Sequence, residues 1–291
     1  MTLTPRQVRE LLARHGLSPS RALGQNFVAD PNTVRRIARL AEVGAGDRVV
    51  EVGPGLGSLT LALVETGAEV TAVELDRHLL PALRSVVEPH GVRVVQGDAM
   101  RLDWHELLGD AGARAGTARR PGFPPDARPW ALVANLPYNV ATPLVLDLLA
   151  GVPAIDRMLV MVQREVGERL AASPGAKAYG IPSVKVAYWA EANVVGRVPP
   201  TVFVPQPRVD SVLVRIHRLP APPVDADPER LFSLVEAGFG QRRKMLRRSL
   251  AELVGPSGFE RAGIRPDARA EELTLADWAR LAADDVGKSP P

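Results

Sequence analysis

Residues 48–60 read RVVEVGPGLGSLT, a β-branched run that passes directly into a glycine-rich turn. The pattern predicts a buried strand over 48–52, a tight turn over 53–57 and a helix that follows it. Such a turn lets a ligand approach the backbone closely at the helix N-terminus, on the carboxyl edge of a sheet. A turn that only packs the helix against the strand is the alternative interpretation. Under either interpretation, the stretch predicts an α/β fold.

Short β-rich runs alternate with helical ones after this stretch. Further strands are predicted over 69–74, 92–96, 130–134 and 157–162, and helices at about 57–66, 76–88, 140–150 and 164–172. Because the strands are apolar on both faces and are joined by helices, they predict a doubly wound parallel sheet. Two more strands, near 192–198 and 211–217, are linked without a helix, so we expect them to form an antiparallel edge.

The chain is expected to form two domains. The first, residues 1–218, contains the sheet and begins with a helical segment over 1–45. After a proline-rich linker at 220–228 the pattern is helical only, at 228–238, 243–254 and 270–284, which predicts a small all-α domain over 219–291. A stretch rich in Gly, Ala, Arg and Pro at 109–129 is interpreted as a surface insertion.

The composition argues against several kinds of chemistry. The 291 residues contain no cysteine, which excludes disulfides, thiolate nucleophiles and cysteine-ligated metals. The five histidines are scattered, and no metalloprotease, P-loop or nucleophile-elbow motif occurs, so we expect no metal. No signal sequence or apolar stretch of membrane length is visible, so we expect a cytoplasmic protein with no membrane partner.

Positive charge is concentrated in two places, although the net charge is only +3. Residues 1–40 hold seven arginines against two acids, and residues 242–248 hold five positive charges and no acid. Two basic patches on a nearly neutral chain suggest a polyanionic partner. Solvated faces without a partner are the alternative.

The spacing of the glycines narrows the class of ligand. Gly53, Gly55 and Gly57 follow one another at every second position, and Ser58 stands where a dinucleotide fingerprint requires glycine. With the acidic Glu51 before it, this spacing resembles the first motif of S-adenosylmethionine-dependent methyltransferases.

Acidic residues follow the next two predicted strands. Glu74 ends the second strand, where a carboxylate can accept hydrogen bonds from both ribose hydroxyls of a cofactor. NAD enzymes also place an acid there, so Glu74 does not separate the two cofactors. Asp98 lies at the end of the third strand, where it could accept from the exocyclic amine of adenine. Each could instead be a solvated acid, but both occur at carboxyl ends of successive strands.

The tetrapeptide Asn135-Leu136-Pro137-Tyr138 follows the fourth strand. An exocyclic adenine amine is a poor nucleophile because its lone pair is delocalised into the ring. Acceptors at the Asn135 side-chain oxygen and the Leu136 carbonyl would favour the pyramidal geometry that frees the lone pair. Pro137 stiffens the turn, and Tyr138 offers a flat face on which an unpaired base can stack. The motif predicts methyl transfer by alignment, without a strong base.

Seven motifs together resemble the small-subunit ribosomal RNA adenine N6,N6-dimethyltransferase family over nearly the whole chain. They are LGQNF (23–27), EVGPGLGSLT (51–60), VELD (73–76), GDAM (97–100), NLPY (135–138), FVPQPRVDS (203–211) and RRKML (242–246). The resemblance implies a Rossmann-like class I methyltransferase sheet, mostly parallel with an antiparallel edge, and a small all-α C-terminal domain. It also implies dimethylation of two adjacent adenosines in a hairpin loop near the 3′ end of the small-subunit RNA.

The resemblance also implies roles for individual residues. Those expected to bind S-adenosylmethionine are Asn26, Val28 through its backbone, Gly53, Gly55, Glu74, Asp98 and Asn135. Tyr138 and Phe203 would sandwich the target adenine, although a single aromatic in a proline-rich link is by itself more typical of core packing. Residues expected to contact RNA are Arg21, Arg242, Arg243, Lys244, Arg247 and Arg248. If 243–254 is helical, like charges lie four residues apart in it and are better tolerated beside a polyanion.

The expected partner is small-subunit ribosomal RNA within a pre-30S particle, and the protein is expected to be a monomer. Two rival functions stay open. One is a methyltransferase of the antibiotic-resistance type, which modifies large-subunit RNA; the 23–27 and 203–211 motifs favour the first function. The other is an RNA-binding assembly factor whose catalysis is secondary.

Overall fold

The computed structural model describes residues 2–20, 23–109 and 128–283. Contacts within the chain divide it into two compact units. Unit 1 consists of Met1–Gly167 and Asn193–Arg218, and unit 2 consists of Glu168–Ala192 and Leu219–Pro291. The greater part of the predicted insertion, residues 110–127, lies outside the described residues, as does Arg21.

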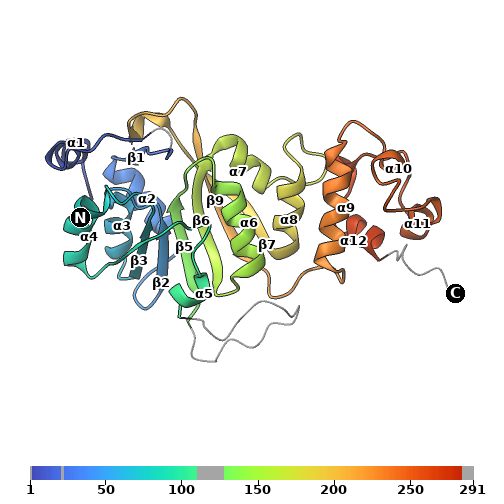
Figure 1. Ribbon diagram of the computed structural model, residues 1–291, viewed down its shortest axis with the longest axis horizontal. Helices are drawn as coiled ribbons and strands as arrows, with labels where there is room; N and C mark the ends of the chain where they lie inside the picture. Colours follow the sequence, from blue (N-terminus) through green and yellow to red (C-terminus); the bar gives the residue numbers. More distant parts are fainter. Residues whose placement is uncertain (1, 21–22, 110–127, 284–291) are drawn as a thin grey trace. The chain divides into compact units, whose positions relative to one another are not determined.

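A seven-stranded sheet in the order β4-β3-β2-β5-β6-β9-β7 forms the core of the fold. Its strands are β2 (Arg48–Val52), β3 (Glu69–Glu74), β4 (Arg93–Gln96), β5 (Trp130–Asn135), β6 (Ile155–Gln163), β7 (Ala190–Val198) and β9 (Ser211–Arg218). The five strands from β4 to β6 are parallel, and β9 pairs with β6 in the antiparallel sense. Figure 1 shows β3, β2, β5 and β6 side by side. The predicted fold class, a mostly parallel sheet with an antiparallel edge, is confirmed.

Helices lie before, between and after the parallel strands, and four of them form at the predicted positions 57–66, 76–88, 140–150 and 164–172. In chain order they are α1 (Pro5–Arg14), α2 (Pro31–Leu40), α3 (Ser58–Val64), α4 (Leu80–Val87), α5 (Trp104–Leu107), α6 (Ala141–Gly151) and α7 (Arg164–Leu170). The first two start where side chains cap their free N–H groups: Thr4 accepts from the backbone of Gln7, and Asp30 from that of Thr33. Their apolar faces, including Val8 and Val34, are buried in the same cluster as strands β2 and β3.

A second, two-stranded sheet pairs segments far apart in the sequence. Strand β1 (Phe27–Val28) is antiparallel to β8 (Phe203–Val204), with Val28 opposite Phe203. Their residues are two apolar pairs without a repeating pattern, so the sequence alone did not predict this sheet. It fixes the 23–28 stretch, which precedes α2, against the chain between β7 and β9.

Unit 2 is built from helices around its own apolar core. They are α8 (Ile181–Trp189), α9 (Pro228–Gly240), α10 (Leu246–Ser249), α11 (Pro256–Ala262) and α12 (Leu275–Ala282). Trp278, Leu231 and Leu234 are fully buried in this core.

The unit boundaries differ from the proposed division at residue 218 because Glu168–Ala192 packs with the C-terminal helices. The hydroxyl of Tyr179 donates to the Leu273 carbonyl, and that of Tyr188 donates to the Ala226 carbonyl, each over 2.9 Å. Burial of these two rings explains why the segment joins the second core although the sheet continues after it.

The prediction of a helix over 243–254 is wrong. Only Leu246–Ser249 is helical there, and the backbone of Met245 is extended. The N–H groups of Leu246 and Arg247 donate to the carbonyls of Ala268 and Pro266 instead. Because Arg243 precedes the helix and Arg247 lies in it, the expected repulsion between like charges four residues apart on one helix does not apply.

Candidate functional site

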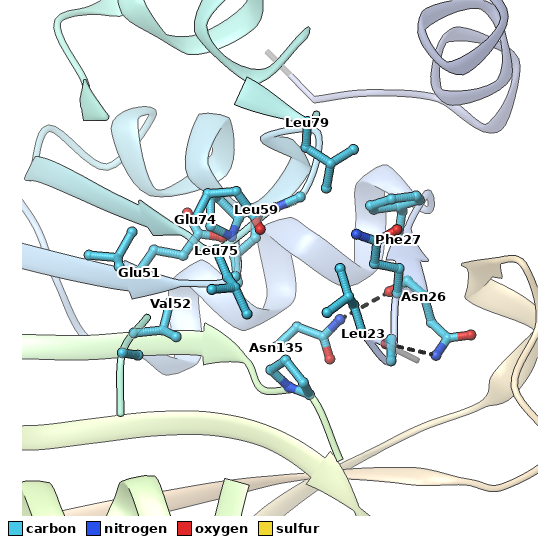
Figure 2. Close-up of a pocket in the computed structure, with 18 of the residues that line it drawn as sticks. Leu23, Asn26, Phe27, Glu51, Val52, Leu59, Glu74, Leu75, Leu79 and Asn135 are labelled. Atoms are coloured by element: carbon cyan, nitrogen blue, oxygen red, sulfur yellow. Dashed lines mark hydrogen bonds between the residues drawn. The ribbon is translucent and has the colours of Figure 1, made fainter. Parts of the chain in front are cut away.

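A pocket in unit 1 lies at the carboxyl ends of β2, β3, β4 and β5. Its walls come from the 23–28 segment, from the glycine turn after β2, and from the residues that follow β3, β4 and β5. The space between these walls, including the open mouth, is about 1090 Å³. Figure 2 shows Glu74 and Asn135 on two walls and Asn26 on a third. The structure thus brings the predicted cofactor residues together, as expected where parallel strands end at one edge.

The glycine turn is held from two sides. Gly55 has a φ of 60°, and a Cβ built on it would lie 2.7 Å from Cδ1 of Phe27. Its N–H donates to Oε2 of Glu74 over 3.1 Å. The missing side chain therefore lets the Phe27 ring and the end of β3 approach the same peptide. Helix α3 begins directly after this turn, so its free N–H groups lie at the pocket.

Glu74 is 6% exposed and hydrogen-bonded through both carboxylate oxygens. Besides the Gly55 bond at Oε2, Oε1 accepts from the Asp76 N–H over 2.9 Å. Burial raises the pKa of Glu74, and these two hydrogen bonds oppose the shift. Because each carboxylate oxygen can accept more than one hydrogen bond, the fixed group still has capacity for ligand hydroxyls.

Asp98 lies two residues beyond β4 and is more exposed than Glu74. Its Oδ1 accepts from the Met100 N–H over 3.0 Å, and its Oδ2 lies 3.7 Å from Nε of Arg101. The apolar side chains next to the two acids, Leu75 and Met100, also line the pocket and are 52% and 37% exposed. We did not single them out from the sequence. The sequence pattern that could have identified them is an apolar residue one or two positions after a strand-end acid. At that place its side chain can cover the flat ring of a ligand.

Glu51 is a third pocket residue to which the sequence alone assigned no role. Its side chain is 1% exposed, it lines the pocket, and its Oε2 has no hydrogen-bond partner among the described residues. Burial raises the pKa of Glu51 to about 8, and the charge of Glu74 adds to the increase. The carboxyl is therefore mostly protonated at neutral pH in this structure.

Asn135 is the last residue of β5, and a contact from a distant segment orients its amide. Its Nδ2 donates to the Asn26 carbonyl over 3.1 Å, so Oδ1 occupies the other branch of the amide and is free to accept. The next N–H, that of Leu136, donates to the Met161 carbonyl and holds the turn against β6. The pocket wall includes Asn135 and Pro137, but Leu136 and Tyr138 lie outside it.

The two predicted stacking residues differ in exposure. Tyr138 is half-buried, whereas Phe203 is 4% exposed and belongs to the hydrophobic cluster that contains Phe27 and Val28. Phe203 does not line the pocket. To sandwich a base, its ring would have to leave this cluster. Val28 is likewise buried, and only its backbone could serve a polar ligand.

The basic run of unit 2 contains one residue with internal partners. Arg242 donates to Glu271 over 2.8 Å and to the Lys177 carbonyl over 3.0 Å. Arg243, Lys244, Arg247 and Arg248 are exposed. We therefore expect these four, more than Arg242, to be available to an anionic partner.

Metal and membrane sites receive no support from the described residues. No group of three acidic or histidine side chains in this part of the chain is arranged to hold a metal ion. Within the same residues, no helix combines the length and apolarity needed to cross a membrane.

Comparison with known proteins places the chain among RNA-modifying enzymes. A family model described as ribosomal RNA adenine dimethylase matches residues 17–284. The ribosomal RNA small subunit methyltransferase A of Thermobifida fusca is 49% identical over 96% of this chain and 95% of the relative. The protein of the same name from Cutibacterium acnes is 50% identical, over 96% and 93%.

Two solved structures share the fold. The 23S rRNA methyltransferase ErmE has a TM-score of 0.65 and 27% identity, and the match covers 89% of this chain and 98% of ErmE. A dimethyladenosine transferase from Plasmodium falciparum has a TM-score of 0.68 over 88% and 95%, at 20% identity.

Proposed function

Because the chain belongs to the ribosomal RNA adenine dimethylase family, we propose that it dimethylates N6 of two adjacent adenosines in small-subunit ribosomal RNA, with S-adenosylmethionine as methyl donor. The target is a hairpin loop near the 3′ end of the RNA, in a pre-30S particle in the cytoplasm. Unpaired bases in a loop cost less to extrude than paired ones. The protein acts as a monomer.

The oriented amide of Asn135 is the observation that carries this proposal. With Nδ2 bound to the Asn26 carbonyl, Oδ1 can accept one N–H of the adenine amine, and the Leu136 carbonyl can accept the other. Two acceptors favour a pyramidal nitrogen whose lone pair is available for in-line attack. The effect is one of preorganised dipoles and alignment, so it requires no strong base.

The pocket next to Asn135 fits an adenosyl amino acid. Glu74 would accept from the ribose hydroxyls and Asp98 from the adenine amine, while Gly53 and Gly55 let the ligand approach the backbone. The unpartnered Oε2 of Glu51 is a further polar group at the wall. When bound, S-adenosylmethionine supplies a sulfonium methyl group, and each transfer forms an N–C bond, breaks the S–C bond and releases a proton from the amine.

The proposal of small-subunit RNA over large-subunit RNA as the substrate rests on sequence identity to the relatives. The relatives named for the small subunit are 49–50% identical to this chain, whereas ErmE, named for 23S RNA, is 27% identical. Residues 219–291 are proposed as the main RNA-contacting region, through the exposed charges at 243, 244, 247 and 248. Methylation of large-subunit RNA is the second candidate function, because ErmE shares the fold over nearly its whole length.

A direct assay separates the two candidates. Purified protein and labelled S-adenosylmethionine are incubated with small-subunit particles from cells that lack the modification and, separately, with naked large-subunit RNA. Digestion to nucleosides should yield dimethyladenosine only from the small-subunit particles. Dimethyladenosine from large-subunit RNA alone would overturn the proposal, and label in neither substrate would contradict both functions.

A further inference from the structure

The 23–28 segment closes one side of the pocket and is tied to the end of β3 by the side chain of Gln25. Its Nε2 donates to Oδ2 of Asp76 over 2.8 Å, and its Oε1 accepts from the Ser20 N–H over 2.7 Å. Because both ends of the amide have partners, the orientation of the Gln25 side chain is defined. Asp76 is anchored in turn, since its Oδ1 accepts from the His78 N–H over 3.0 Å.

The same segment is tied to the end of β5 by the next residue. The Asn26 carbonyl accepts from Nδ2 of Asn135, and the Asn26 side chain donates to the Gly24 carbonyl over 3.2 Å. Gly24 has a φ of 65°, and a Cβ built on it would lie 3.5 Å from Cβ of Pro137. Two consecutive residues thus connect the segment to the chain just after β3 and to the end of β5.

We propose that Gln25 is a positioning residue for the methyl transfer. By fastening the 23–28 segment to Asp76, it holds the Asn26 carbonyl where that group orients the amide of Asn135. The inference rests on the proposed function in one respect, the assignment of Asn135 Oδ1 as an acceptor for the adenine amine. Neither the family resemblance nor the pocket position of Gln25 assigned it this role.

The physical reason lies in the symmetry of a carboxamide. Its oxygen and nitrogen have nearly the same shape, so only hydrogen bonds decide which of them faces the substrate. If the Asn26 carbonyl moves away, Asn135 can turn its NH₂ toward the adenine amine, where two donors face each other. The loss should therefore appear in kcat for methyl transfer, more than in the affinity for the cofactor.

Exchanging donor and acceptor tests the pair directly. In the double variant Gln25→Glu with Asp76→Asn, the new carboxylate at position 25 can accept both from the new amide at position 76 and from the Ser20 N–H. The oxygen of that amide can still accept from the His78 N–H, and the double variant keeps the net charge of the parent. Gln25→Glu alone places two carboxylates in contact, and Gln25→Met removes the hydrogen bonds at nearly constant length. Asn32→Asp, at an exposed position of α2, is the control for the acid that Gln25→Glu adds.

The variants are compared by kcat on small-subunit particles, by the Kd for S-adenosylhomocysteine and by thermal unfolding. We expect Gln25→Met and Gln25→Glu to lower kcat by about ten- to a hundredfold, which is the loss of rate that a small misplacement of reacting groups causes. The Kd should change by less than about threefold, and the exchanged pair should recover kcat to within about threefold of the parent, because the network is restored.

Three results would overturn the inference. They are an unchanged kcat in Gln25→Met, a kcat in the exchanged pair no better than in Gln25→Glu, and an effect confined to the Kd. If Gln25→Met does not fold, the comparison of Gln25→Glu with the exchanged pair still tests the positioning role of Gln25. Failure of the proposed function is a separate result, since parent protein would then leave small-subunit RNA unmodified.

Discussion

The side-chain amide of Asn135 donates to the backbone carbonyl of Asn26, a residue 109 positions earlier, over 3.1 Å. This bond leaves Oδ1 of Asn135 as the acceptor and makes the 23–28 segment part of the proposed methyl-transfer site. The hydrogen bond fixes where the Asn135 amide lies and also which of its two polar atoms is left to face a substrate. A substrate amine requires both, because it must meet an acceptor at the right position.

Replacing Asn135 should abolish most of the methyl transfer. Asn135→Ala removes the acceptor, and Asn135→Asp removes the donor that binds the Asn26 carbonyl. Loss of one preorganised group at a transition state costs about a hundred- to a thousandfold in rate, and we expect each variant to lose at least that much in single-turnover assays. Asn32→Ala, at an exposed position of α2, serves as the control. Unchanged turnover in Asn135→Ala would refute the assigned role.

Glu51 should make stability fall as the pH rises. The pKa of this buried carboxyl is about 8, above its value of 4.5 in a model peptide. Between these values the unfolded chain loses the proton and the folded chain keeps it, so unfolding becomes easier with increasing pH. The slope should be on the order of 1 kcal/mol per pH unit, and Glu51→Gln should flatten it. Denaturant unfolding from pH 5 to 8 measures this, and equal slopes in both proteins would contradict the prediction.

Gly55→Ala should destabilise the protein and weaken cofactor binding. The substitution meets two obstacles, a φ of 60° and the Phe27 ring 2.7 Å from the new Cβ. Gly91→Ala is a matched control, because Gly91 has a φ of 81° and nothing within 4 Å of its Cβ position. In the control, the free energy of unfolding should fall by about 1 kcal/mol because of backbone strain alone. In Gly55→Ala it should fall by about 1–3 kcal/mol more because of overpacking against Phe27. Equal losses in chemical denaturation would show that Phe27 moves away at no cost.

Neutralising Arg243 and Arg247 should reduce the salt dependence of RNA binding. Each lost phosphate contact lowers the slope of log K against log salt by about 0.7–0.9, so Arg243→Gln with Arg247→Gln should lower it by about 1.5. Arg242→Gln should have less effect, because Arg242 is paired with Glu271. Binding of a small-subunit RNA fragment at several salt concentrations measures the slopes. An unaltered slope in the double variant would mean that these arginines are solvated and do not contact the RNA.

Phe203 and Tyr138 should respond differently to replacement by leucine. Phe203 is 4% exposed within a hydrophobic cluster, so Phe203→Leu should lower the free energy of unfolding by about 1–3 kcal/mol. Tyr138 is half-buried and belongs to the turn proposed to bind the target adenine, so Tyr138→Leu should mainly lower kcat/KM for methylation. Thermal unfolding and single-turnover assays distinguish the two. A stable Phe203→Leu variant with low kcat/KM would support the sandwich geometry instead.

Much of the sheet and of the pocket at its edge could be predicted from local patterns. The run at 48–60 identified a strand, a glycine turn and a helix, and β2 spans Arg48–Val52 as predicted. Glu74 and Asp98 could be assigned to one edge because parallel strands joined by helices all end on the same side of their sheet. The NLPY motif at 135–138 indicated the chemistry for the same reason, since it follows another of these strands.

Contacts between distant segments could not be predicted in this way. Nothing local distinguishes the carbonyl of Asn26 as the partner of Asn135, or the amide of Gln25 as the partner of Asp76, which is 51 residues away. Local sequence also did not predict that Tyr179 and Tyr188 would be buried with the C-terminal helices, or that the backbone of Leu246 would bond to that of Ala268.

The sequence by itself determined the sheet, the edge at which the pocket lies and the residue types proposed for methyl transfer, because alternation of strands and helices and strand-end motifs are local properties. Only the tertiary structure decided which group orients Asn135, that Phe203 is buried, and where the units divide. These features depend on the register of β1 with β8 and on which apolar surfaces pack together. Both are determined by packing over the whole chain.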